Sequence, residues 1–103
     1  MYKTIITEPA ELDIIRAVQY IAGELLNPFA AEGLLDDIES SISSLGKTPK
    51  RHGLIRNEQL ALAGFRFMPI RNYMLFYIAK EDTNTVVIER FLHSRRDWIH
   101  IIG

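Results

Sequence analysis

The stretch Gly64–Trp98, GFRFMPIRNYMLFYIAKEDTNTVVIERFLHSRRDW, decides how this chain folds. It contains three runs rich in aromatic and branched residues, at Phe65–Met68, Tyr73–Ala79 and Thr85–His93, and each is typical of a β-strand. Pro69 is expected to end the first run, because proline has no N–H to donate to a strand ladder. The links between the runs are too short for parallel crossovers, so the sequence predicts a three-stranded antiparallel meander.

Two helical segments precede the meander, at Glu8–Leu25 and Pro28–Leu45. Apolar residues recur in each at helical spacing, which predicts one apolar face per helix. Thr7 and Asn27 are expected to cap the two N-termini, and Gly46 is expected to follow the second helix as its C′ residue. The residues expected to be buried against the sheet are Ile14, Ile15, Val18, Leu34, Leu35 and Ile38.

The remaining elements are short. A strand is expected at Tyr2–Thr7, and Ser94 can cap a last helix that runs to about Ile101 and carries Arg95 and Arg96 in its first turn. Residues 58–63 fit either a helical turn or an extension of the first meander strand. The order β-α-α-β-β-β-α predicts an α+β fold, an antiparallel sheet covered on one face by a helical hairpin. The length predicts a single domain, 1–103.

The net charge of −1 conceals an uneven distribution. Residues 1–45 carry two cationic and eight acidic side chains, a net charge of −6, whereas residues 46–103 carry ten and five, a net charge of +5. A negatively charged partner would therefore meet the second half. The chain has no cysteine, which excludes disulfides and thiolate chemistry, and its three histidines have no metal-ligand spacing. We expect no metal or cofactor, no membrane partner and a cytoplasmic location.

The order of elements, with the segments GFRFMPIRNYMLFY and ERFLHSRRDW, resembles the RelE/ParE superfamily of bacterial type II toxin–antitoxin toxins, the plasmid-stabilisation type. The resemblance covers nearly the whole chain. It implies a toxin neutralised by a cognate antitoxin whose C-terminal segment wraps it. It also implies one of two targets: RelE-like members cleave mRNA on the ribosome without a metal, and ParE-like members inhibit DNA gyrase with no catalytic residues of their own.

The second meander strand favours the ParE-like branch. RelE-like toxins usually read Tyr-Arg-aliphatic-aliphatic-Tyr there, with the arginine at the phosphate, and Met74 stands in the place of that arginine. A thioether cannot neutralise a phosphate, and a net acidic chain is poorly suited to RNA. If the protein is a nuclease, the candidate catalytic residues are Arg66, His93 and Arg96. A family member that has lost toxicity and only binds partners is a third alternative.

The end of the last strand carries the candidate target-binding residues, in a His-x-Arg-x-Asp pattern that resembles ParE. His93 can orient the following turn or act as a general acid or base. Arg90 stands in a row with Val86, Ile88 and Leu92, where it lies either at an exposed rim or against a helix carboxylate. Arg66 is expected on the open face of the sheet, opposite two buried phenylalanines. Expected at the gyrase contact are Arg90, His93, Arg95, Arg96, Asp97 and Trp98, and at the antitoxin contact Arg66, Arg71, Arg95 and Arg96.

Overall fold

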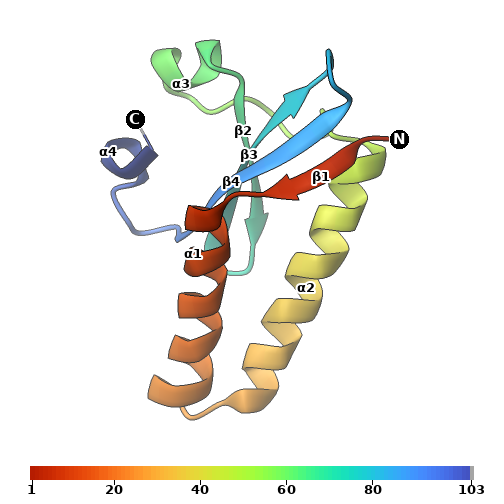
Figure 1. The fold of residues 1–103 in the computed structure, drawn as a ribbon. Helices are drawn as coiled ribbons and strands as arrows, with labels where there is room; N and C mark the ends of the chain where they lie inside the picture. The colour runs from red at the N-terminus through yellow and green to blue at the C-terminus, as the bar shows by residue number, and fades with distance from the viewer. Residues whose placement is uncertain (103) are drawn as a thin grey trace.

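Four strands form one sheet in the order β1-β4-β3-β2 (Figure 1). In this computed structural model, which describes residues 1–102, the strands are β1 (Lys3–Ile6), β2 (Phe65–Ile70), β3 (Tyr73–Lys80) and β4 (Thr85–His93). β2, β3 and β4 form the antiparallel meander that the sequence predicts. β1 pairs in parallel with β4, so the prediction of a purely antiparallel sheet is wrong. Parallel strands need a long connection between them, and here the connection from β1 to β4 begins with the two long helices.

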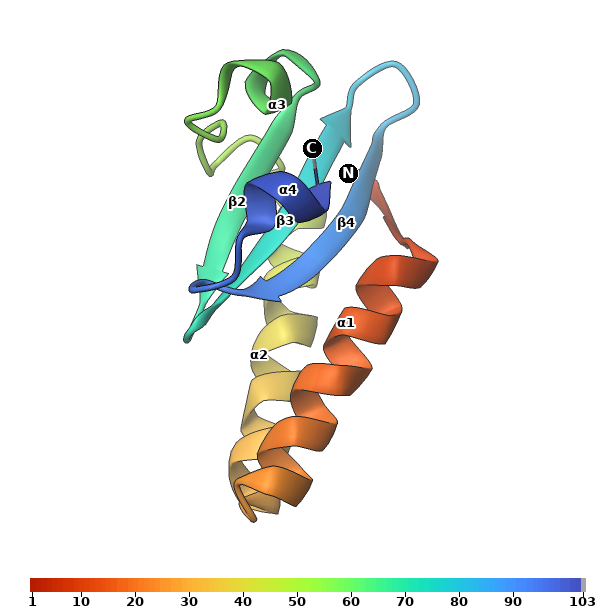
Figure 2. The same ribbon diagram turned by 90° about the vertical axis from the view of Figure 1, so that its left-hand side faces the viewer.

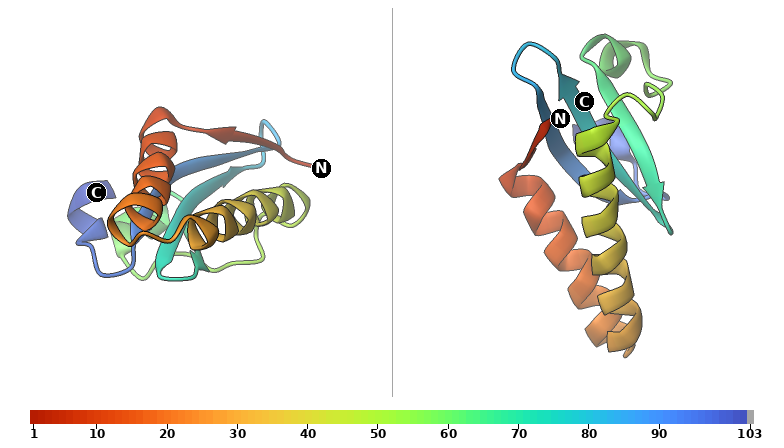
Figure 3. Two further views of the ribbon diagram at one scale, coloured as in Figure 1. Left: turned by 90° about the horizontal axis from the view of Figure 1, so that it is seen from below. Right: turned by 90° about the vertical axis from the view of Figure 1, so that its right-hand side faces the viewer.

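The helical hairpin consists of α1 (Glu8–Gln19), a π-helical turn η1 (Tyr20–Glu24) and α2 (Pro28–Lys47). Its two predicted N-caps are confirmed: the side chains of Thr7 and Asn27 accept backbone N–H groups at 3.2 and 3.0 Å. Figure 2 and Figure 3 show that the closed end of the hairpin projects past the edge of the sheet. Much of that end is therefore exposed to solvent.

Gly46 lies inside α2, not after it, so the predicted C′ role is wrong. Its small size serves a contact with the start of the chain instead. The Tyr2 N–H donates to the Gly46 carbonyl oxygen at 2.8 Å, and a Cβ atom on Gly46 would lie 3.2 Å from the Tyr2 carbonyl oxygen. This close approach holds the segment before β1 against the end of α2.

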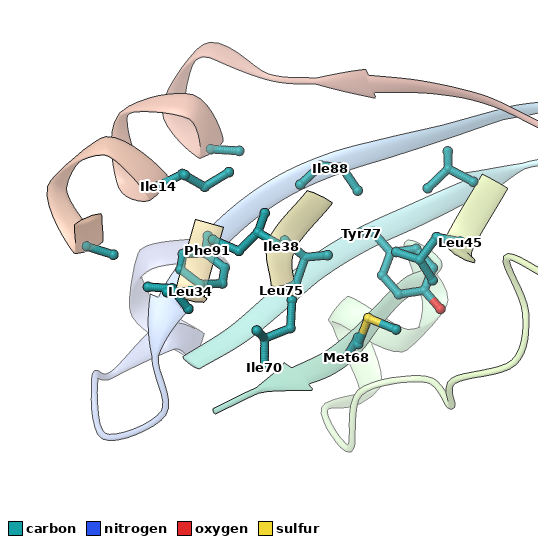
Figure 4. Close-up of a cluster of buried hydrophobic side chains, with 13 residues drawn as sticks. Ile14, Leu34, Ile38, Leu45, Met68, Ile70, Leu75, Tyr77, Ile88 and Phe91 are labelled. Carbon is teal, nitrogen blue, oxygen red and sulfur yellow. The ribbon is translucent and has the colours of Figure 1, made fainter. Parts of the chain in front are cut away.

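One hydrophobic core fills the space between the hairpin and the sheet (Figure 4). Ile14, Leu34 and Ile38 are buried in it, as predicted. Ile15 and Leu35 are 42% and 38% exposed, so the prediction that they are buried is wrong. Each lies one position after a buried residue, about 100° further around the helix, which turns it to the edge of the apolar face. Val18 is partly buried and packs against the same core.

A β-bulge in β4 determines which side chains face the hairpin. Tyr77 pairs with Ile88 and Phe76 pairs with Arg90, so Glu89 has no partner in the ladder. The extra residue shifts the alternation of faces beyond it. Ile88 and Phe91 therefore both lie in the hairpin core, whereas Leu92 lies in a second core on the other face. The predicted row that joins Arg90 to Ile88 is wrong for this reason.

The second face of the sheet is partly covered by α3 (Glu58–Leu62) and α4 (Trp98–Ile102), as Figure 2 shows for α4. α3 is the helical turn, one of the two forms that the sequence allows there. Phe65 and Phe67 pack in the core on this face. Because β2 alternates, Arg66 lies on the hairpin side, so its predicted place on an open face is wrong. The sequence does not indicate that the two phenylalanines belong to a different core from the hairpin.

The end of β2 and the start of α4 also differ from the prediction. β2 continues through Pro69, which pairs with Met74. Proline is tolerated here because β2 is an edge strand. α4 begins at Trp98 and not after Ser94, because residues 94–96 form a turn in which the Arg96 N–H donates to the His93 carbonyl oxygen at 3.0 Å. Within residues 1–102, no helix is long and apolar enough to span a membrane.

Candidate functional site

A pocket of about 440 Å³ lies where α1 meets the ends of β3 and β4. We call it the α1–β4 pocket. α1 contributes residues at successive helical turns, and this spacing puts them on one side of the helix. The bulge in β4 directs two further aromatic rings to the same side of the sheet. The lining residues are Asp13, Arg16, Ala17, Tyr20, Tyr73, Phe91, Leu92, His93 and Arg96.

Aromatic rings form one wall of the pocket. Tyr73 stacks on Phe91 with ring centroids 4.8 Å apart, and it meets the edge of the His93 ring at 5.3 Å. Burial, and to a lesser degree the nearby Tyr20, raises the pKa of Tyr73. The Tyr73 hydroxyl therefore stays protonated at neutral pH and is available as a hydrogen-bond donor.

His93 organises the turn that follows β4. The Arg95 N–H donates to His93 Nδ1 at 3.2 Å. When the ring is neutral, this bond leaves the proton on Nε2. The Ser94 N–H donates to the Asn72 carbonyl oxygen at 2.9 Å, which ties the same turn to the turn between β2 and β3. The backbone that carries Arg96 is thereby fixed next to the pocket.

Asp13 and Arg90 form an ion pair at the edge of the pocket. Arg90 donates from Nε and Nη2 to the two carboxylate oxygens of Asp13 at 2.7 and 2.9 Å. The Phe91 N–H donates to the same carboxylate at 3.0 Å. The side chains of Asp13 and Arg90 are only 5% and 24% exposed. Of the two sequence-based alternatives for Arg90, the pair with a helix carboxylate is the one present, and hydrogen bonding to Asp13 raises the pKa of Arg90.

This pair leaves the pocket with a net positive charge. The carboxylate of Asp13 is neutralised by Arg90, which does not line the pocket. Within residues 1–102, no carboxylate forms an ion pair with Arg16 or Arg96. Two arginines therefore line one cavity without an ion-pair partner in the described part of the chain.

The two other predicted arginines of the basic half lie outside this pocket and bond within the chain. Arg71 donates from Nε to Asp37 at 2.8 Å and from Nη1 to the Ala30 carbonyl oxygen at 3.2 Å. It crosses α2 at Gly33, where a Cβ atom would come within 2.7 Å of its Nη2. Arg66 donates from Nη1 to the His52 carbonyl oxygen at 2.7 Å. Both side chains hold neighbouring segments in place.

The three residues proposed for a nuclease are not brought together. His93 and Arg96 line the pocket and Arg66 does not. Arg66 pairs with Tyr77, whereas His93 pairs with Tyr73 at the other end of β3. Four residues of strand separate the two pairing positions by about 13 Å. The Arg66 guanidinium is also bonded to the His52 carbonyl oxygen, so the structure does not gather the three side chains at one site.

The other predicted target-binding residues follow the pocket along the chain. Arg95 and Asp97 are exposed, and Asp97 lies 2.5 Å from Nδ1 of His100. That hydrogen bond, followed by the charge of Asp97, raises the pKa of His100. Trp98 packs against Phe76 with ring centroids 5.4 Å apart and anchors α4 to the sheet.

The sequence-based predictions missed Arg16, Tyr20 and Tyr73 as residues of this pocket. A signal for the two helical residues is the polar series Asp13, Arg16 and Tyr20, which continues at helical spacing from α1 into the first residue of η1. Residues 1–102 contain no group of three histidine or carboxylate side chains that could hold a metal ion.

Comparisons with known proteins agree with this fold. The model of the family described as the ParE toxin of the type II toxin–antitoxin system, parDE, matches residues 4–98. The chain belongs to this ParE toxin family, which confirms the resemblance noted in the sequence. Among curated proteins, none matches its sequence.

Two solved structures share the fold. A chain of the chromosomal ParDE TA system from P. aeruginosa has a TM-score of 0.71 and 17% identity, with 90% of this chain and 96% of that chain covered. A chain of the toxin–antitoxin complex RelBE2 from Mycobacterium tuberculosis has a TM-score of 0.62 and 24% identity, with 89% and 96% covered. At these identities the likeness concerns the fold alone.

Proposed function

We propose that this protein is the toxin of a type II toxin–antitoxin pair, that it inhibits DNA gyrase, and that a cognate antitoxin neutralises it. Membership of the ParE toxin family supports the first part. The choice of gyrase over the ribosome rests on one observation. Met74 stands where a RelE-like nuclease carries its phosphate-binding arginine, and Arg66, which could replace it, lies outside the pocket that His93 and Arg96 line.

An exposed apolar surface on the hairpin supports protein partners. Leu25, Leu26 and Phe29 at its closed end are 56%, 83% and 86% exposed, and Leu12 and Ile15 on α1 are 44% and 42% exposed. Grouped apolar side chains on a small protein are typical of a protein-binding surface. The fold neighbours include a toxin–antitoxin complex, which supports an antitoxin as one partner.

The antitoxin contact combines this apolar surface with the basic residues. An acidic antitoxin segment binds Arg95 and Arg96 directly. At Arg66 and Arg71 it accepts hydrogen bonds from the guanidinium N–H groups that are not used in bonds within the chain. Gyrase contacts the turn after β4, around His93, Arg95, Arg96 and Asp97. Arg90, paired with Asp13 of α1, and Trp98, packed on Phe76, lie on either side of that turn. Because charges contribute, the affinity for the antitoxin should fall as salt rises. An affinity that does not change with salt would contradict the charged part of this contact and would support only its apolar part.

The experiment that tests the target follows two incorporation rates after induction in growing cells. Thymidine incorporation should fall before amino-acid incorporation, and purified protein should inhibit supercoiling by gyrase. Arg96→Ala should weaken the inhibition, whereas Arg56→Ala, an exposed arginine in the loop before α3, is the matched control. The gyrase assignment is wrong if amino-acid incorporation falls first and mRNA is cut in the ribosomal A site. If Arg66→Ala or His93→Ala then abolishes the cuts, the protein is an mRNA endonuclease. If neither rate falls, the protein is a binding member without toxicity.

A further inference from the structure

We infer that the α1–β4 pocket receives the carboxylate of one Glu or Asp side chain from a segment of a partner protein, held between Arg16 and Arg96. That this partner is the antitoxin rests on the proposed function. The chemistry of the pocket is argued independently of it, from the charges, donors and neighbouring surface of the described residues.

The first argument is charge. Asp13 is the one carboxylate in the lining, and three hydrogen bonds from Arg90 and the Phe91 N–H already occupy it. Arg16 and Arg96 thus lack a counter-charge within residues 1–102. Two like charges facing one cavity repel each other, and an anion between them converts this repulsion into two attractive contacts.

The second argument is the kind of hydrogen-bonding group. A guanidinium has donors only, and His93, whose Nδ1 accepts the Arg95 N–H, presents only its Nε2–H. Tyr73 stays protonated and can donate. A cavity whose free polar groups are donors selects a ligand with acceptors only, and an ionised carboxylate is such a ligand.

The third argument separates a protein carboxylate from the phosphates of a nucleic acid. The pocket holds about 440 Å³, room for a side chain or two, and residues 1–45, which include the helices beside it, carry a net charge of −6. A nucleic acid brings a charge at every nucleotide and would meet that acidic surface. A single carboxylate meets only the two arginines.

The fourth argument is continuity with apolar surface. Leu12 precedes Arg16 by one helical turn, so the two share one side of α1. Leu12 and Ile15 are 44% and 42% exposed. A partner segment that lies along α1 therefore contacts leucine and isoleucine first and reaches the pocket within about one turn. This order favours a segment in which apolar residues flank one acidic residue.

The test uses two short synthetic peptides, acetyl-Ala-Leu-Glu-Ala-Leu-amide and the same peptide with glutamine in place of glutamate. Each is titrated into isotopically labelled protein while NMR follows the side-chain Nε–H signals of the arginines. The glutamate peptide should shift the signals of Arg16 and Arg96 and saturate, and the glutamine peptide should not. Arg16→Met and Arg96→Met should each weaken binding by about tenfold, since each removes a charge-assisted hydrogen bond.

Arg56→Met is the matched control, because it removes the same charge from an exposed loop outside the pocket and should leave the titration unchanged. Backbone amide spectra check that every variant is folded. Equal shifts with both peptides, no shift, or shifts confined to other arginines would overturn the inference. Tighter binding of inorganic phosphate than of the glutamate peptide would also overturn it, in favour of a phosphate site. None of these results depends on gyrase or an antitoxin, so the proposed function is tested separately.

Discussion

Replacing Arg90 by methionine removes the cation that holds Asp13 in place. The side chain of Asp13 is 5% exposed, so after the substitution its carboxylate lies buried with only the Phe91 N–H as a partner. Breaking a buried ion pair from one side typically costs about 3–5 kcal/mol. Because one hydrogen bond remains and methionine fills part of the space, we expect a loss near the lower end, about 3 kcal/mol, in the free energy of unfolding.

The double variant Asp13→Leu with Arg90→Met distinguishes pairing from packing. With both charges gone, the remaining cost is the unsatisfied Phe91 N–H, about 1–3 kcal/mol. The double variant should therefore be at least as stable as Arg90→Met alone. Urea denaturation, monitored by circular dichroism with a common slope, measures the two single variants, Arg90→Met and Asp13→Leu, and the double variant. A loss below about 1 kcal/mol for Arg90→Met, or a double variant that loses the sum of the two single changes, would refute the assigned coupling.

Other predictions test the core, the loop before α3 and the end of the chain. Ile38→Ala, at a position 2% exposed, should cost about 2–5 kcal/mol in chemical denaturation, and a loss below about 0.5 kcal/mol would show that the assigned helix face is wrong. Tyr77→Phe removes the 2.8 Å hydrogen bond to the Pro49 carbonyl oxygen and should cost about 1 kcal/mol, with faster proteolysis of that loop. His100 should titrate by NMR above its usual pKa of about 6.5, and Asp97→Asn should abolish the rise. Because the folded pKa is raised, the contact with Asp97 is fully present below pH 6.5 or so and is lost as pH rises through the folded pKa.

Local signals predicted the helices, the meander and both N-caps, because spacing and capping act over a few residues. Which side chains of β4 lie on each face of the sheet depends instead on the β-bulge at Glu89. A strict period of two places Arg90 beside Ile88, and the unpaired Glu89 breaks that period without any mark in the sequence. The position of Arg90 against α1, and the pocket beside it, could not be predicted from alternation.

Long-range contacts explain the remaining errors. Gly46 looked like the end of a helix, but its lack of a side chain serves the approach of Tyr2. Arg66 looked accessible because nothing in the sequence indicates that Phe65 and Phe67 pack in a second core. In each case the residue's role is set by a contact with a segment distant in the sequence, so the residue type alone does not determine that role.

The parallel pairing of β1 with β4 has a consequence for the order in which the molecule can assemble. β1 is synthesised before the other strands and β4 after them, yet the Lys3 N–H bonds the Asn84 carbonyl oxygen and the Thr7 N–H bonds the Ile88 carbonyl oxygen. The Thr7 hydroxyl, which also caps α1, donates to the Glu89 carbonyl oxygen. The start of α1 therefore reaches its final position only after β4 has left the ribosome, and contacts so distant in sequence slow folding. A nascent chain therefore cannot present the finished α1–β4 pocket until β4 has been synthesised and has paired with β1.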